Sequence, residues 1–168
     1  MLTLIICLLI AAAAIVWLIA RRKSGNMLFA SNSAAGRHDT GNLTRLAEAA
    51  ITTRYLLGKK GTDPETQVLV GGASDIPDFV ITDEAEVAGE PVGCAALGVA
   101  SGTLPMVASG AINIASVHFL VPDANGKVKA LPSASATYYV IGKPLTSASA
   151  DGDTIEVAHC TPYAVVVS

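Results

Sequence analysis

The sequence has few charged residues, few aromatic residues and little cysteine. Only 15% of its 168 residues are charged and 5% are aromatic, whereas 51% are hydrophobic. Disordered chains combine low hydrophobicity with high charge, so this composition excludes a disordered protein. Three cysteines are too few for a fold held together by disulfides.

An excess of positive charge is also missing. The formal net charge is −3, and a protein that binds a phosphate backbone needs a basic face. The charge therefore argues against a nucleic-acid partner. The length allows one domain, or two small ones.

The apolar residues are concentrated at the N-terminus. Residues 2–20 form a run of nineteen in which Thr3 is the one polar side chain, and Arg21, Arg22 and Lys23 follow directly. As a helix the run would span about 28 Å, close to the hydrocarbon core of a bilayer. We expect residues 1–23 to form a transmembrane-like helix with a basic collar, and the basic residues would keep the body in the cytoplasm.

Other interpretations of this run stay open. It could be a cleaved signal peptide, although a signal peptide carries its positive charge before the apolar stretch. It could be buried in a protein assembly, or it could precede a true start at Met27. The residues after position 23 include eight basic residues and all fourteen acidic ones, so the body is an acidic domain of net charge −6.

The body divides into an arm and a β domain. Residues 24–45 are rich in Ser, Asn, Gly and Ala and are interpreted as a flexible arm or linker. The apolar spacing over residues 43–51 predicts one short helix. The rest reads as short strands between turns, with Asn125-Gly126 as a strong hairpin signal. The predicted strands are 54–57, 67–70, 78–82, 91–97, 117–121, 127–130, 137–141, 154–159 and 164–167.

A weak internal repeat suggests two related lobes. The residues after Ala50 resemble those after Ala111, residues 78–82 resemble 138–142, and the stretch from Glu86 resembles the stretch from Ser149. The offsets are 61, 60 and 63 residues, although short apolar strands can also match by chance. We therefore expect a mainly β fold, a small β-barrel or sandwich over 46–168, with lobes at about 46–100 and 101–168.

No group of residues predicts catalysis, a cofactor or a metal site. His38, His118 and His159 lack the spacing to the cysteines that would aim two donors at one metal. A thiol hydrolase that uses Cys94 or Cys160 with a histidine is a minor alternative. The acidic residues at 83–86 and 151–153 occur at predicted turns, where Asp and Gly are favoured for backbone reasons. We therefore predict a protein that is not an enzyme.

Residues 40–168 resemble the capsid decoration, or cement, proteins of tailed bacteriophages. The resemblance rests on "DANGKVKALP" from Asp123, "YYVIGKPLTSASADGDTIEV" from Tyr138, and the closing "VVV" at 165–167. These are patterns of turns and small residues rather than a catalytic signature. An apolar N-terminus is a departure from this family.

The resemblance implies a structural protein of the virion. Such a protein would bind the outside of the capsid shell, contact the major capsid protein lattice, form a homotrimer and stabilise the shell. The arm would contact the shell, and no cofactor or nucleic acid would be involved. The alternative is a membrane-anchored protein whose cytoplasmic β domain serves as an interaction module.

Overall fold

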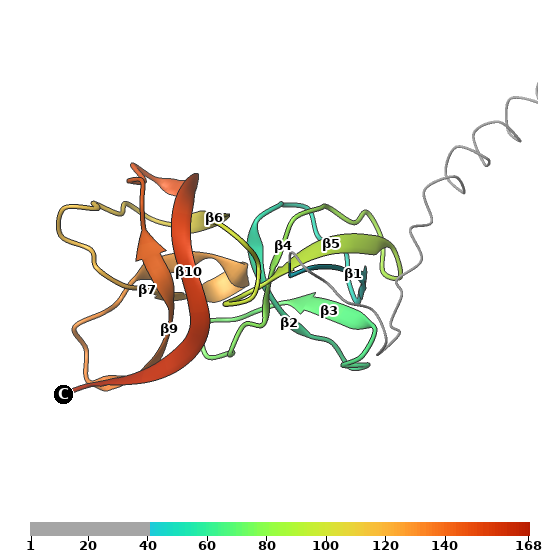
Figure 1. Cartoon of the computed structure of the whole chain (residues 1–168), viewed down its shortest axis with the longest axis horizontal. Helices are drawn as coiled ribbons and strands as arrows, with labels where there is room; N and C mark the ends of the chain where they lie inside the picture. The colour runs from blue at the N-terminus through green and yellow to red at the C-terminus, as the bar shows by residue number, and fades with distance from the viewer. Residues whose placement is uncertain (1–40) are drawn as a thin grey trace, which may run out of the picture.

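The computed structural model describes residues 41–168, which are strands joined by turns and loops (Figure 1). The predicted N-terminal helix at 1–23 and residues 24–40 of the predicted arm lie outside the described residues. Among residues 41–168 there is no α-helix, and thus none that could cross a bilayer. The prediction of a mainly β fold built on barrels is confirmed.

The first five strands close into a small barrel. In chain order they are β1 (Asn42–Ala47), β2 (Leu56–Lys60), β3 (Gln67–Val70), β4 (Phe79–Ile81) and β5 (Pro91–Ala96). Around the barrel the order is β1-β3-β2-β4-β5, and β5 pairs with β1 to close it. The β1–β3 pair is parallel and the other pairs are antiparallel.

The second five strands close into another barrel. They are β6 (Leu104–Ser109), β7 (Leu120–Pro122), β8 (Val128–Ala130), β9 (Ala136–Pro144) and β10 (Asp151–Val167). A 3-10 turn, η1 (Ala124–Gly126), joins β7 to β8, and Asn125 there adopts a φ of 60°. This turn is the hairpin that the Asn-Gly pair predicts, because both residues tolerate positive φ.

The two barrels share one topology. The second barrel has the order β10-β6-β8-β7-β9, and its one parallel pair is β6–β8. Each strand of the first barrel therefore corresponds to the strand numbered five higher in the second, from β1 and β6 to β5 and β10. The pairings match Ala47 with Ala108 and Val68 with Val128, and the bridge Ile51–Ala85 with Ile112–Ala148.

These pairings test the repeat that the sequence suggests. The offset of 61 residues between the stretches after Ala50 and Ala111 agrees with the bridges, in which Ile51 corresponds to Ile112. The offset of 63 residues between the stretches from Glu86 and Ser149 agrees with the registers of β5 and β10. The match of 78–82 with 138–142 is wrong by three residues. Phe79 pairs with Ala96, and its counterpart in the second barrel is Gly142, which pairs with His159. The error arose because β9 is longer than β4 and repeats the same apolar pattern.

The barrels pack against each other through a common hydrophobic cluster. Leu57, Val80 and Leu97 of the first barrel belong to the same buried cluster as Met106 and Ile155 of the second. The Val107 N–H donates to the Tyr55 carbonyl oxygen at 3.2 Å, across the junction. The first barrel also has a smaller cluster of its own, which includes Val68, Ile81 and Val92.

Several local predictions need correction. The helix predicted over 43–51 is wrong. Asn42–Ala47 form β1 instead, and the backbone of β1 pairs with β5 on one side and β3 on the other. Residues 42–45 of the predicted linker therefore lie in a strand. The strand β6 was not predicted, since Pro105 interrupts its apolar run. The two strands predicted at 154–159 and 164–167 form one continuous strand, β10.

Candidate interaction surfaces

A two-stranded ribbon extends beyond the second barrel. We call Ala136–Val140 of β9 and Tyr163–Val167 of β10 the C-terminal ribbon. Figure 1 shows the end of β10 curving away from the first barrel toward the C-terminus. Inside the barrel β9 pairs with β10 only as far as Gly142 with His159, and an irregularity separates that part from the ribbon. The first barrel has no equivalent, because β4 is three residues long and β5 is six.

Both outer edges of the ribbon lack a strand partner within residues 41–168. Pairing between β10 and β6 ends at Val157 with Leu104, and beyond it the residues near Gly98 contact His159, so Tyr163–Val167 have no strand partner on that side. Pairing between β9 and β7 is limited to Leu120 with Gly142. Each edge therefore presents backbone N–H and C=O groups that are free to pair with another strand.

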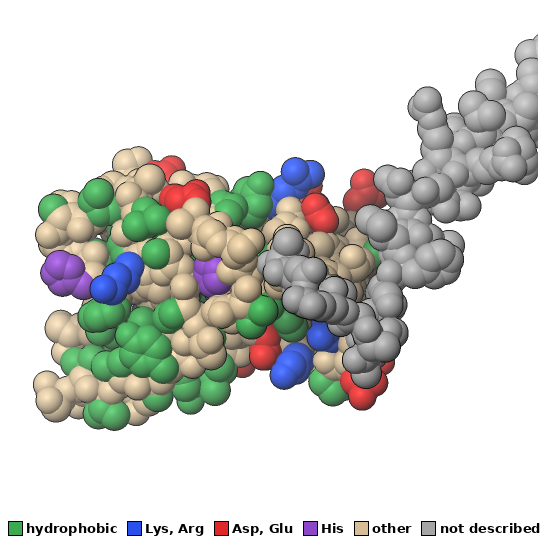
Figure 2. All heavy atoms as spheres, viewed as in Figure 1, with side chains coloured by type: hydrophobic (Ala, Val, Ile, Leu, Met, Phe, Trp, Pro, Cys, Tyr) green, Lys and Arg blue, Asp and Glu red, His purple; other side chains and the backbone are tan. Residues whose placement is uncertain are grey.

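The side chains of the ribbon are apolar or uncharged on both faces. Directly opposite residues of an antiparallel pair point to one face. Val166 is 74% exposed and Tyr163 is 45% exposed, which is unusual for large hydrophobic residues in strands. Figure 2 shows hydrophobic side chains gathered in the same part of the molecule. One face carries Ala136, Tyr138, Val140, Tyr163, Val165 and Val167, and the other carries Thr137, Tyr139, Ala164 and Val166.

A shallow pocket of about 190 Å³ lies where the ribbon joins the barrel. Phe119, Cys160 and Tyr163 contribute to its lining, and the Lys143 ammonium lies 5.6 Å from the centroid of the Phe119 ring. Within the described residues Lys143 is not paired with a carboxylate. A cation over an aromatic ring is a modest stabilising contact. The pocket is thus a continuation of the apolar ribbon with one positive charge at its rim.

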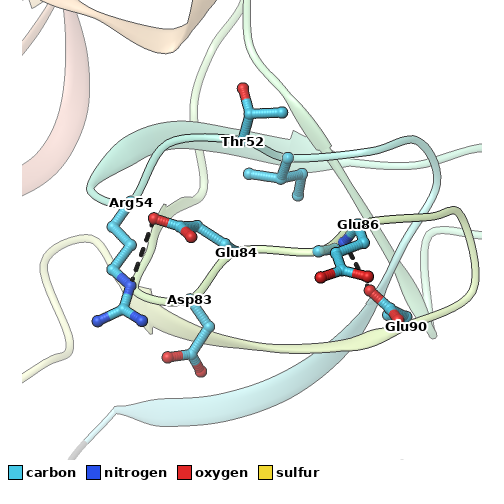
Figure 3. Close-up of a pocket in the computed structure, with 8 residues that line it drawn as sticks. Thr52, Arg54, Asp83, Glu84, Glu86 and Glu90 are labelled. Atoms are coloured by element: carbon cyan, nitrogen blue, oxygen red, sulfur yellow. Dashed lines mark hydrogen bonds and ion pairs between the residues drawn. The ribbon is translucent and has the colours of Figure 1, made fainter.

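The first barrel has an acidic surface instead (Figure 3). Asp83, Glu84, Glu86 and Glu90 surround an open hollow of about 640 Å³. The carboxylates that have a partner there bind neighbouring groups of the same barrel. Glu90 Oε2 accepts from the Glu86 N–H at 2.6 Å, Asp83 accepts from the Gly93 N–H at 2.9 Å, and Glu84 lies 3.6 Å from Arg54 Nε.

The residues singled out for chemistry do not converge. Burial raises the pKa of the Cys94 thiol to about 12, and a 1% exposed thiol that stays protonated is a poor nucleophile. Burial also raises the pKa of Cys160. His118 is exposed, and His38 lies outside the described residues. Within residues 41–168 no three His, Cys, Asp or Glu side chains are placed to hold a metal ion.

His159 has a structural position at the junction of the barrels. Its Nδ1 accepts the Gly98 N–H at 2.9 Å, so the last turn of the first barrel is tied to β10. The Nε2 atom is buried without a hydrogen-bond partner in the described part of the chain. The other acidic pair, Asp151 and Asp153, lies at the start of β10. There Asp151 binds Lys127 at 2.7 Å and Asp153 accepts the Ser149 N–H at 2.7 Å.

Comparison with known proteins shows a similarity to a solved structure. No protein-family model and no curated protein sequence matches the chain. Among solved structures, the fold is similar to the head fiber gp8.5 N base of bacteriophage phi29, with a TM-score of 0.52 and 17% sequence identity. The match covers 76% of this chain and 92% of that chain. At this identity the similarity shows a shared fold.

Proposed function

We propose that this chain is a structural protein of a phage virion that binds the outside of the capsid and stabilises the shell as a homotrimer. The observation that carries the proposal is the shared fold with a phage head fiber base. The resemblance of residues 40–168 to capsid decoration proteins supports it independently, because that resemblance rests on sequence patterns and the other on backbone geometry.

The surface of the chain fits this role. Residues 41–168 offer apolar strands with free edges, and strand edges serve association between chains. Many modest contacts on a symmetric lattice add up to firm attachment without any single strong site. In this proposal the chain has no catalytic residue, and its partners are the major capsid protein lattice and copies of itself.

The direct test is binding of the full chain to purified, DNA-free capsid shells of the phage that encodes it. We expect the chain to sediment with the shells at a saturable ratio and to raise the temperature at which they break. A chain that stays in the supernatant at all concentrations would contradict the proposal. Carbonate extraction of host membranes addresses the membrane-anchored alternative, because a true anchor stays in the pellet.

A further inference from the structure

We propose that the C-terminal ribbon joins copies of this chain, with the free β10 edge of one copy paired to the free β9 edge of the next. The inference rests on the proposed homotrimer and names the surface that makes it. A second copy of this chain is the occupant that the edges, the charge and the geometry favour.

The first argument is that both edges are unprotected. Proteins usually guard exposed strand edges with lysines, prolines or very short strands, because free edges recruit other chains. Residues 136–140 and 163–167 contain no charged residue and no proline. The ribbon is also the part of the second barrel that the shared topology does not require, since β4 and β5 close their barrel without it. An unprotected extension of this kind is expected where a partner covers it.

The second argument is charge. The described residues include seven basic and thirteen acidic side chains, and most of the acidic excess lies in the first barrel, so two copies repel each other most where their first barrels meet. Residues 131–142 and 157–168 carry no ionisable acid or base other than histidine, cysteine and tyrosine. Copies can therefore approach most closely through the ribbon, where the face that carries the exposed Val166 also gains from leaving water.

The third argument is geometric closure. Each ribbon has one free edge on β9 and one on β10, so copies joined β10 to β9 form a ring when the rotation closes. Three copies supply six strands, close to the five that close each barrel of this chain. Two copies would supply only four. A trimer is the smallest assembly that pairs every edge in a barrel of ordinary size.

The test compares variants of the full chain in one non-ionic detergent, used throughout because residues 2–20 are apolar. Val166→Lys and Thr137→Lys place a charge on exposed positions of β10 and β9 that lie directly opposite each other. Val87→Lys, 58% exposed in the first barrel, is the matched control. Light scattering gives the mass, and thermal unfolding by circular dichroism checks that each variant is folded.

We expect the wild-type chain and Val87→Lys to have three times the monomer mass, and the two ribbon variants to have the monomer mass. Amide hydrogen exchange gives a second measurement. Residues 136–140 and 163–167 should exchange at least tenfold more slowly in the wild-type trimer than in Val166→Lys.

Three results would overturn the inference: a trimer that survives both ribbon substitutions, a wild-type chain that is monomeric, or rapid exchange at both ribbon edges in the wild-type chain. The shell-binding test separates these failures from failure of the proposed function. A monomer that binds shells would contradict the ribbon inference but support capsid binding. A trimer that does not bind shells would contradict capsid binding but support the ribbon inference.

Discussion

The two barrels of this chain have the same strand order but different surfaces. Residues 41–100 carry nine acidic and four basic side chains, whereas residues 101–168 carry four acidic and three basic ones. The second barrel is nearly neutral, and it alone carries the long strands that make the ribbon. The same closed framework thus supports an acidic, well-solvated half and an apolar half suited to association.

The difference shows which positions the framework constrains. Counterparts such as Ala47 and Ala108, or Ile51 and Ile112, are buried in both barrels, where they fill small closed cores. Outside the cores the two halves differ in charge and in strand length, and both barrels are closed nonetheless. The proposed association between copies therefore depends on residues in which the two barrels differ.

The largest expected effect comes from breaking the core that the barrels share. Leu57 is fully buried in the cluster that includes Met106 and Ile155, so Leu57→Ala removes contacts on both sides of the junction. We expect a loss of about 2–5 kcal/mol in the free energy of unfolding. Denaturant unfolding should show one transition for both barrels. Ile81→Ala, in the cluster confined to the first barrel, is the comparison, and two separate transitions in the wild-type chain would contradict a shared core.

A smaller effect is expected from Gly126→Ala, where η1 of the second barrel meets β2. Gly126 has a φ of +70°, and a Cβ there would lie 2.8 Å from the Leu57 carbonyl oxygen and 2.7 Å from a Val70 methyl group. We expect a loss of about 1–3 kcal/mol from backbone strain and the clash together.

Gly152→Ala is the matched control for this substitution. Gly152 has a similar positive φ of +89°, but no atom lies within 4 Å of the added Cβ. Its substitution should cost about 1 kcal/mol from strain alone. Equal losses in the two variants, measured by urea unfolding, would show that the contact between η1 and β2 contributes nothing.

The sequence predicted the β class, the hairpin at Asn125 and the duplication, because turn residues and alternating apolar runs are local signals. It missed β1 and β6, which begin the two barrels. Each of these strands is fixed by partners far along the chain, such as β5 for Leu43 and β10 for Met106. The free edges of the ribbon could not be predicted either, because they depend on where β6 and β7 stop pairing with β10 and β9. No local pattern records the absence of a neighbour.

The smallest expected effect concerns the acid stability of the first barrel. Lys59 Nζ lies 2.8 Å from Asp75, and this hydrogen bond, helped by the Gly72 N–H, lowers the pKa of the Asp75 carboxyl. A carboxyl whose pKa is lower in the folded state stabilises the fold above its unfolded pKa of about 3.9, and that stability is lost as the pH falls through the folded value.

Asp75→Asn should therefore cost less than about 1 kcal/mol at neutral pH, since the pair is partly exposed and screened by solvent. The difference between Asp75→Asn and the wild-type chain should shrink as the pH falls below about 3.9 and through the lowered pKa of the folded state. The second barrel offers Asp153→Asn as its counterpart, where the Ser149 hydroxyl and backbone N–H lower the pKa of a partly exposed carboxyl. Urea unfolding from pH 2 to 7 measures both. A difference for Asp75→Asn that grows on acidification would reverse the assigned direction of the Asp75 pKa shift, and with it the conclusion that the Lys59–Asp75 pair stabilises the first barrel.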